Sequence, residues 1–258
     1  MLCLSGGMDS TGLLVHLLAR GCRVYGISYD YGQKHKLELD RLEANLTYLS
    51  SQGHKISHKV VDISVLGSLY NSSLTTEGWD IPEGHYEQDT MKQTVVPNRN
   101  AIFSSIAYGY ALSLANKTEE EVSLCLGVHS GDHAIYPDCR PEFYDAIHHA
   151  FAIGNWDSER VCMYLPYLSG DKYTILKDAQ HSIEKLRLDF NEIFRNTNTS
   201  YNPDIKGRAS GKTGADIERV LAFHRLGIAD PVAYVKPWED VLADALKLQQ
   251  EHEQSASA

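Results

Sequence analysis

The most constraining feature of this sequence is the hexapeptide SGGMDS at residues 5–10, which stands between a short apolar segment and an amphipathic one. That order predicts a strand, a tight turn and a helix. The two glycines allow the backbone to bring N–H groups close to an anion, the serine hydroxyls add donors, and the helix presents its positive N-terminal end. The alternative is an ordinary glycine-rich turn in which Asp9 or Ser10 caps the helix. The strand–turn–helix context favours a phosphate-binding loop.

Strand and helix patterns alternate over the first two thirds of the chain. This alternation predicts an α/β fold with a doubly wound, mostly parallel sheet that helices cover on both faces. The segment 100–116 is apolar nearly all round, so we expect a buried helix there. The predicted strands are 1–4, 23–28, 58–62, 122–127 and 161–166, and the predicted helices are 11–20, 37–50, 100–116 and 141–153.

The pattern becomes helical after residue 166, with predicted helices at 174–186, 190–195, 215–226 and 237–251. We therefore expect a nucleotide-binding α/β domain at 1–168, a helical C-terminal subdomain at 169–252 and a disordered tail at 253–258. The polar segment 66–97, punctuated by glycine and proline, is too long for a simple connection and predicts a lid or an insertion.

Composition restricts the classes of partner. A formal net charge of −10 does not favour broad binding to nucleic acid, because phosphate contacts need a cationic surface. No apolar run approaches the roughly 18–20 residues of a membrane-spanning helix, so we expect no membrane partner and a cytoplasmic location. The five cysteines are scattered singly, which predicts reduced and buried thiols.

A second glycine-rich string, GRASGKT at residues 207–213, looks like a Walker A loop. Three residues separate its glycines where that motif has four, and no apolar strand precedes it. We expect no second nucleotide site there.

The SGGMDS hexapeptide resembles the PP-loop of the ATP pyrophosphatases. By that resemblance Ser5, Gly6, Gly7, Asp9 and Ser10 hold the phosphates of ATP, Ser5 and Asp9 act in catalysis, and Asp9 helps to hold Mg²⁺. The implied reaction is attack on the α-phosphorus of ATP, which forms an adenylate and releases pyrophosphate and then AMP. The chain would thus be an adenylate-forming C–N ligase.

Three further strings narrow the resemblance to the 7-cyano-7-deazaguanine synthase (QueC) family, from the first strand to about Phe223. They are YDYGQKH at residues 29–35, VPNRN at residues 96–100 and GVHSGDHAIYPDCR at residues 127–140. The family uses ATP twice on a 7-carboxy-7-deazaguanine, first to make the amide with ammonia and then to dehydrate it to the nitrile. A 7-deazaguanine base is therefore the implied substrate.

The resemblance also implies roles for side chains outside the hexapeptide. Gln33 and Arg99 would bind the nucleotide, and Lys172 would act in catalysis by bridging the α-phosphate and the substrate carboxylate. The alternatives are that Arg99 only caps the helix that follows it, and that Lys172 is an exposed surface lysine.

The string around residues 132–140 would bind the base. A purine-like base needs polar groups on its edge and an aromatic face, and the substrate-binding residues expected here are Asp132, Tyr136, Asp138 and Arg140. The alternative is that Asp138 and Arg140 only form a turn and a surface ion pair.

One departure from the family concerns a four-cysteine zinc site near its C-terminus. Aligned with that pattern, the four positions hold Ser200, Ser210, Thr213 and Asp216, and Arg219 stays in register. Hydroxyls are poor zinc ligands and one carboxylate cannot replace four thiolates. Zinc is predicted absent, and no metal-binding residues are expected.

A second departure lies close to the expected chemistry, where His129 precedes Asp132 and Ile135 takes space that glycine leaves open in the family. Together the two departures predict an enzyme similar to the QueC-like proteins of anti-phage defence operons, which passes the activated deazaguanine to another amine, on a partner protein. The alternatives are an ordinary synthase that makes the nitrile from ammonia, and a catalytically silent nucleotide-binding partner subunit. We expect a homodimer.

Overall fold

The computed structural model describes residues 1–34, 37–132 and 134–256. A five-stranded sheet has the order β3-β2-β1-β4-β5, and every neighbouring pair is parallel. The order places β1 at the switch point, because the chain moves outward in one direction through β2 and β3 and in the other through β4 and β5. The strands are β1 (Leu2–Cys3), β2 (Tyr25–Asp30), β3 (Ser57–Asp62), β4 (Val122–Cys125) and β5 (Val161–Tyr164).

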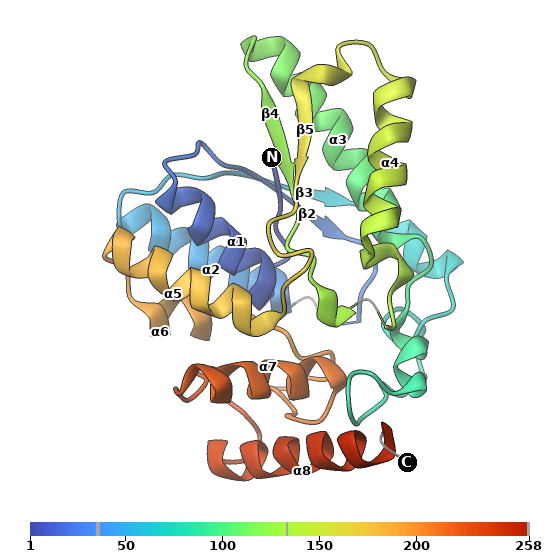
Figure 1. Cartoon of the computed structure of the whole chain (residues 1–258), viewed down its shortest axis with the longest axis vertical. Helices are drawn as coiled ribbons and strands as arrows, with labels where there is room; N and C mark the ends of the chain where they lie inside the picture. Colours follow the sequence, from blue (N-terminus) through green and yellow to red (C-terminus); the bar gives the residue numbers. More distant parts are fainter. Residues whose placement is uncertain (35–36, 133, 257–258) are drawn as a thin grey trace.

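Helices cover both faces of the sheet (Figure 1). One face carries α1 (Met8–Ala19), α2 (Leu37–Ser51), α5 (Lys172–Leu186) and α6 (Phe190–Arg195), and the other carries α3 (Arg99–Thr118) and α4 (Pro141–Gly154). The predicted α/β class with a doubly wound parallel sheet is confirmed. Each predicted strand and helix appears, with ends that differ by a few residues.

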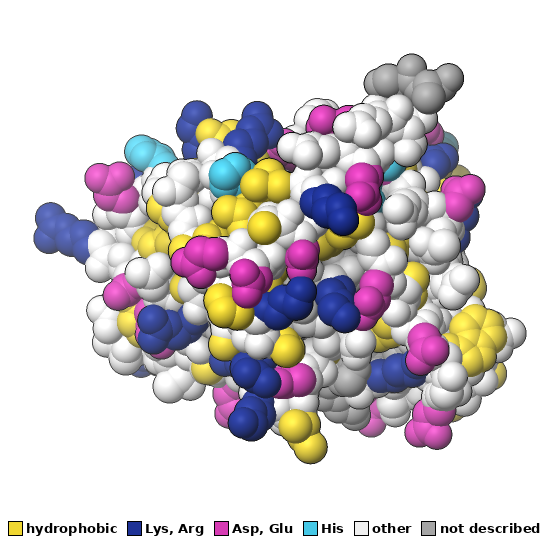
Figure 2. Space-filling view, turned by 90° about the horizontal axis from the view of Figure 1, so that it is seen from below, with side chains coloured by type: hydrophobic (Ala, Val, Ile, Leu, Met, Phe, Trp, Pro, Cys, Tyr) yellow, Lys and Arg dark blue, Asp and Glu magenta, His cyan; other side chains and the backbone are white. Residues whose placement is uncertain are grey.

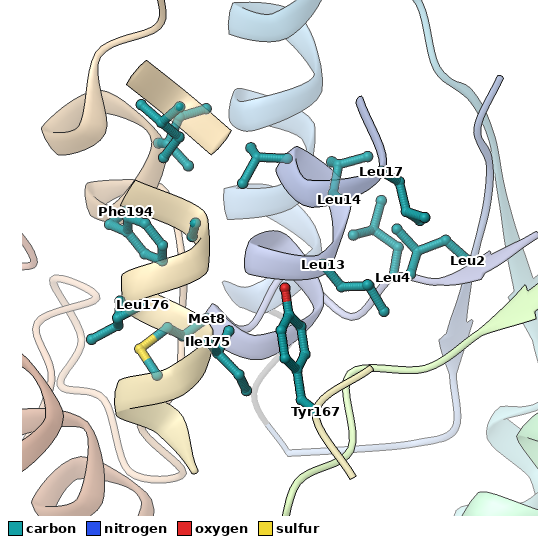
Figure 3. Packing of buried hydrophobic residues seen from close by; sticks show 14 of the residues in the cluster. Leu2, Leu4, Met8, Leu13, Leu14, Leu17, Tyr167, Ile175, Leu176 and Phe194 are labelled. Atoms are coloured by element: carbon teal, nitrogen blue, oxygen red, sulfur yellow. The ribbon is translucent and has the colours of Figure 1, made fainter. Parts of the chain in front are cut away.

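The larger core lies between the sheet and α1 (Figure 3). Leu13 and Leu14 of α1 are fully buried, and Ile175 and Leu176 of α5 pack against the same cluster. A Cβ atom at Gly12 would lie 2.5 Å from the Ile175 side chain, so the glycine permits the close approach of α1 and α5. Helices α5 and α6, although they follow residue 168, are therefore part of the α/β core.

The last two helices form a separate pair that lies below the sheet in Figure 1. They are α7 (Gly214–Leu226) and α8 (Trp238–Ala256), and Ile217 and Val220 of the first pack with Val241 and Ala245 of the second. Figure 2 views this face, where basic and acidic side chains are interspersed. Helix α8 includes residues 253–256, the first part of the expected tail, whereas residues 257–258 lie outside the described residues.

The prediction that residues 100–116 form a helix buried nearly all round is wrong for one side of α3. Its buried face consists of Ser104, Ala107, Tyr108, Ala111 and Ala115, while residues 105, 109, 113 and 116 are exposed. The helix is an outer layer of the molecule, so only the side that faces the sheet and α4 is enclosed.

The long segment 66–97 carries two short 3₁₀ helices, η1 (Ser64–Leu69) and η2 (Asp89–Thr94). The second half of this segment packs against the α/β domain, where Thr94 is buried and its hydroxyl contacts that of Tyr136. In the described part of the chain, no helix is long and apolar enough to cross a membrane.

Candidate active site

A cavity of about 260 Å³ opens where β1, β2 and β4 end. Its wall includes Ser5 after β1, Tyr31 after β2 and Gly127 after β4. The carboxyl ends of strands at a switch point are where open α/β sheets bind ligands. The fold therefore places the SGGMDS loop in the expected location for a ligand site.

The loop is a compact turn that only glycine permits at its second position. Gly6 has a φ of 87°, and a Cβ atom there would lie 2.1 Å from the carbonyl oxygen of Glu38. The hydroxyls of Ser5 and Ser10 lie 3.1 Å apart, and the Gly7 N–H donates to the Ser5 hydroxyl at 3.2 Å. Gly7 is the N-cap of α1 and provides no side-chain cap, so the first turn of the helix faces the cavity with N–H groups suited to phosphate.

A cluster of charged side chains stands beside this loop. The ammonium of Lys172, which is 5% exposed, lies 3.2 Å from Asp9 Oδ2 and 2.9 Å from Glu218 Oε2. His129 Nε2 lies 2.7 Å from the same nitrogen. The alternative of an exposed surface lysine at position 172 is therefore wrong, because two carboxylates and a histidine enclose it.

The Asp9 carboxylate is kept ionised by these neighbours. Burial would raise the pKa of Asp9, but Lys172 and His129 hold it well below its usual range. Its Oδ1 atom is buried and has no hydrogen-bond partner among the described residues. An ionised carboxylate with one free oxygen, next to a phosphate-type loop, fits a Mg²⁺ ion that is also bound by phosphates.

Aromatic and cationic side chains form another part of the wall. Arg99, the first residue of α3, interacts electrostatically with Tyr31, Tyr136 and Tyr201, and all four line the cavity. The Tyr136 hydroxyl lies 2.5 Å from that of Thr94. This wall offers aromatic surface and a half-buried cation within the same cavity as the phosphate-type loop.

Gln33 is not among the residues that line the cavity. Its amide nitrogen donates to Glu38 Oε1 at 3.0 Å, and its oxygen accepts from the Tyr31 N–H at 2.9 Å. Glu38 does line the cavity, and burial raises its pKa to about 7. Gln33 therefore positions a carboxyl group that titrates near neutrality.

The expected base-binding residues are only partly brought together. Tyr136 lines the cavity, whereas Asp138 accepts a hydrogen bond from the Asn100 N–H at 3.2 Å, at the start of α3. Arg140 is the N-cap of α4 and does not line the cavity. Asp132 ends the short 3₁₀ helix η3 (Ser130–Asp132), but its side chain lies outside what the structure describes.

Of the four positions that the sequence analysis aligned with zinc ligands, three converge on the fourth, the buried carboxylate of Asp216. Asp216 Oδ2 accepts hydrogen bonds from the hydroxyls of Ser200 at 3.1 Å, Ser210 at 2.7 Å and Thr213 at 2.9 Å. The N–H groups of Lys212 and Thr213 also donate to this oxygen, each at 3.2 Å. A hydrogen-bonded cluster therefore holds together the loop that precedes α7.

Comparison with known proteins assigns the chain to a family. The family model described as "Queuosine biosynthesis protein QueC" matches residues 1–227. The chain belongs to the QueC family. It is 45% identical over 231 residues to a 7-cyano-7-deazaguanine synthase of Alteromonas mediterranea, which covers 89% of this chain and 95% of that protein. It is 42% identical over 234 residues to a 7-cyano-7-deazaguanine synthase of Methanoregula boonei, which covers 91% of this chain and 98% of that protein.

QueC membership confirms the sequence-based resemblance and makes the chain an enzyme of the ATP-pyrophosphatase type. Two residues of the charged cluster were missed as site residues by sequence reasoning. His129 was noticed only as a departure from the family, and Glu218 stands inside a helical pattern more than two hundred residues after the loop. The burial of Lys172 between them could not be read from sequence spacing, because it results from the packing of α7 against α5.

Proposed function

We propose that this QueC-family enzyme adenylates a 7-deazaguanine, first at a carboxylate and then at an amide, with ATP as a substrate. The observation that carries the proposal is one cavity that combines the SGGMDS loop, the buried cation Lys172 and an aromatic wall. The relatives named as 7-cyano-7-deazaguanine synthases support the deazaguanine as the class of substrate.

The chemistry follows from the order of these parts in the cavity. A carboxylate oxygen of the base attacks the α-phosphorus of ATP, and the bond to pyrophosphate breaks. The loop N–H groups and the hydroxyls of Ser5 and Ser10 stabilise the departing pyrophosphate. Lys172, whose ammonium is fixed by Asp9 and Glu218, neutralises charge between the carboxylate and the α-phosphate.

Asp9 would hold Mg²⁺ through the oxygen that has no hydrogen-bond partner. The ion would offset negative charge on the phosphates. The wall formed by Tyr31, Arg99 and Tyr136 would bind the base, since a flat purine-like ring packs on aromatic surface and a cation complements its polar edge. Roles for Asp132, Asp138 and Arg140 at the base, and for Gln33 at the nucleotide, stay predictions.

We further propose that the amine is ammonia and that the product is the nitrile. Ammonia attacks the adenylated carbonyl carbon and AMP leaves, which gives the amide. The amide oxygen is then adenylated by a second ATP. Loss of AMP and of the two nitrogen-bound protons gives the nitrile. The relatives named as 7-cyano-7-deazaguanine synthases favour this outcome. The Asp216 cluster supports it too, because its hydrogen bonds hold the loop that precedes α7 in place next to the cavity wall.

The second candidate is the transfer of the activated base to an amine of a partner protein, as in the QueC-like proteins of anti-phage defence operons. One observation favours it: Ile135, which is 5% exposed, lines the cavity where the family is expected to have glycine, so the wall of the cavity differs there. A homodimer and a cytoplasmic location stay predictions.

The experiment is to incubate the enzyme with ATP, Mg²⁺, 7-carboxy-7-deazaguanine and an ammonium salt, and to identify the products by mass. We expect AMP, pyrophosphate and the nitrile. Formation of AMP and pyrophosphate without amide or nitrile would refute the ammonia step and favour the second candidate. If ATP is not cleaved at all, the adenylation itself is wrong and a silent nucleotide-binding subunit remains.

A further inference from the structure

Helix α8 lies beyond residues 1–227, the part of the chain that the QueC model matches, yet it contacts a segment that borders the active site. His85 Nε2 lies 2.9 Å from Gln249 Oε1 of α8, and Glu87 Oε2 lies 2.9 Å from His252 Nε2. Tyr86, between the two contacting residues, lines the catalytic cavity. The C-terminal helix is thus connected to the wall of the cavity through two histidines and a carboxylate.

The three side chains are arranged as a group that can ligate a metal. One ligand atom from each of His85, Glu87 and His252 lies within 4.8 Å of the others. Among the described residues, no other three His, Cys, Asp or Glu side chains come so close together. The imidazole rings of His85 and His252 are stacked, with centroids 4.0 Å apart and planes at 11°. To bind one ion, the stacked rings would have to turn out of their parallel arrangement, so that one nitrogen of each points at the same metal as the carboxylate oxygen.

Burial and charge suit a bound cation. His85 is 1% exposed and fixed in the protein, whereas the side chains of Glu87 and His252 are 42% and 27% exposed and face an entry path from solvent. Glu87 and Glu253 both act electrostatically on His85, so the surroundings are negative. Two imidazole nitrogens and one carboxylate oxygen are the donors that zinc and neighbouring transition metals prefer.

We propose that His85, Glu87 and His252 bind a divalent transition-metal ion of the Zn²⁺ class, with water or Gln249 Oε1 as the fourth ligand. The ion joins α8 to segment 85–87 and so fixes the position of Tyr86 at the catalytic cavity. The expectation that zinc is absent was drawn from the loop around Asp216, and the new site does not involve that loop. It would be a structural site that the C-terminal helix adds to a QueC enzyme.

The test is zinc binding to the full-length chain after treatment with a chelator, measured by competition with a chromophoric zinc indicator. We expect one equivalent to bind to the wild-type chain. His252→Ala, at the partly exposed end of α8, and Glu87→Gln should each weaken binding at least tenfold, since even the loss of an outer-shell partner costs about 10- to 100-fold. His224→Ala, which removes an exposed histidine from α7, is the matched control and should bind zinc as the wild type does.

A second measurement, hydrogen exchange with and without zinc, compares each chain with itself, so a difference in stability between the chains does not decide the result. Zinc should slow hydrogen exchange in residues 84–88 and in α8 of the wild-type chain, and should not do so in His252→Ala. The proposal is overturned if the wild-type chain binds no stoichiometric zinc, if His252→Ala and Glu87→Gln bind as tightly as the wild type, or if His224→Ala is weakened to the same extent.

Discussion

Replacement of Asp216 by alanine should destabilise the protein more than any exposed carboxylate replacement. Five donors converge on Asp216 Oδ2: the hydroxyls of Ser200, Ser210 and Thr213 and the N–H groups of Lys212 and Thr213. Asp216 is 1% exposed and Ser200 and Thr213 are 2% and 1% exposed, so water cannot replace the lost acceptor without opening the loop. The contact from the Thr213 N–H is also half of the capping box at the start of α7, and the other half is the Asp216 N–H, which donates to the Thr213 hydroxyl.

The size of the destabilisation depends on the hydrogen bonds that the substitution removes and on the cost of carboxylate burial that it relieves. A hydrogen bond to a charged group contributes about 1.5–3 kcal/mol, and each buried donor left without an acceptor costs about 1–3 kcal/mol. The values do not add, because the donors share one oxygen and because burial of the carboxylate, which raises the pKa of Asp216, already costs stability. We expect the Asp216→Ala change to lower the free energy of unfolding by about 3–5 kcal/mol, the range for breaking a buried charged network.

The assay is urea unfolding followed by circular dichroism, together with thermal melting. For a chain of this size, about 3–5 kcal/mol corresponds to a fall in Tm of about 6–20 °C. Asp216→Asn keeps one acceptor oxygen and should lose less. Asp145→Ala, an exposed carboxylate on α4, is the control and should change stability by no more than about 0.5 kcal/mol. If the Tm of Asp216→Ala equals that of Asp145→Ala, the cluster does not hold the loop and the reasoning fails.

Three further outcomes test the active site. Asp9→Ala and Ser5→Ala should abolish release of AMP and pyrophosphate with an unchanged circular dichroism spectrum, and release of ADP and phosphate by the wild type would contradict the assignment. Lys172→Met should lower kcat/KM by at least about 100-fold, the cost of losing one electrostatic donor, with folding checked by thermal melting. Burial raises the pKa of Glu38 to about 7, so at pH values between about 4.5 and about 7 this group is protonated in the folded chain and ionised in the unfolded chain. The free energy of unfolding should therefore fall by about 2–3 kcal/mol as the pH rises from about 4.5 to about 7. Urea midpoints measure this pH dependence, and Glu38→Gln should remove it.

The order of the elements could be predicted because it depends on local patterns. The apolar segment 1–4, the two glycines and the amphipathic helix that follows are neighbours in the sequence, so their pattern determines strand, turn and helix together. The exposed side of α3 could not be predicted in the same way. Its small residues at 105, 109 and 113 suit either a buried or an exposed surface, and only the packing of α4 and the sheet decides which side is covered.

The residues of the candidate site, too, could be predicted only where local sequence patterns determine them. Ser5, Asp9 and Ser10 line the cavity, and they could be proposed because the chemistry of a phosphate loop lies in adjacent residues. Glu218 was missed, and Gln33 and Asp138 do not line the cavity, because their surroundings come from distant segments. For such residues the pattern gives the residue type but not the partner.

The predicted loss of four thiolates is compatible with the proposed active site, because hydrogen bonds connect the loop to the SGGMDS turn. The Asn198 N–H donates to the Gly6 carbonyl at 3.0 Å, directly behind the glycine turn. Arg219, which is 2% exposed, donates to the Thr197 hydroxyl at 2.7 Å and the Thr199 hydroxyl at 3.0 Å, on both sides of that contact. A loop fixed by hydrogen bonds at Asp216 and at Arg219 keeps residues 197–201 against the cavity. The predicted loss of zinc-binding cysteines would therefore change what stabilises this wall, and it gives no reason to expect a different reaction inside it.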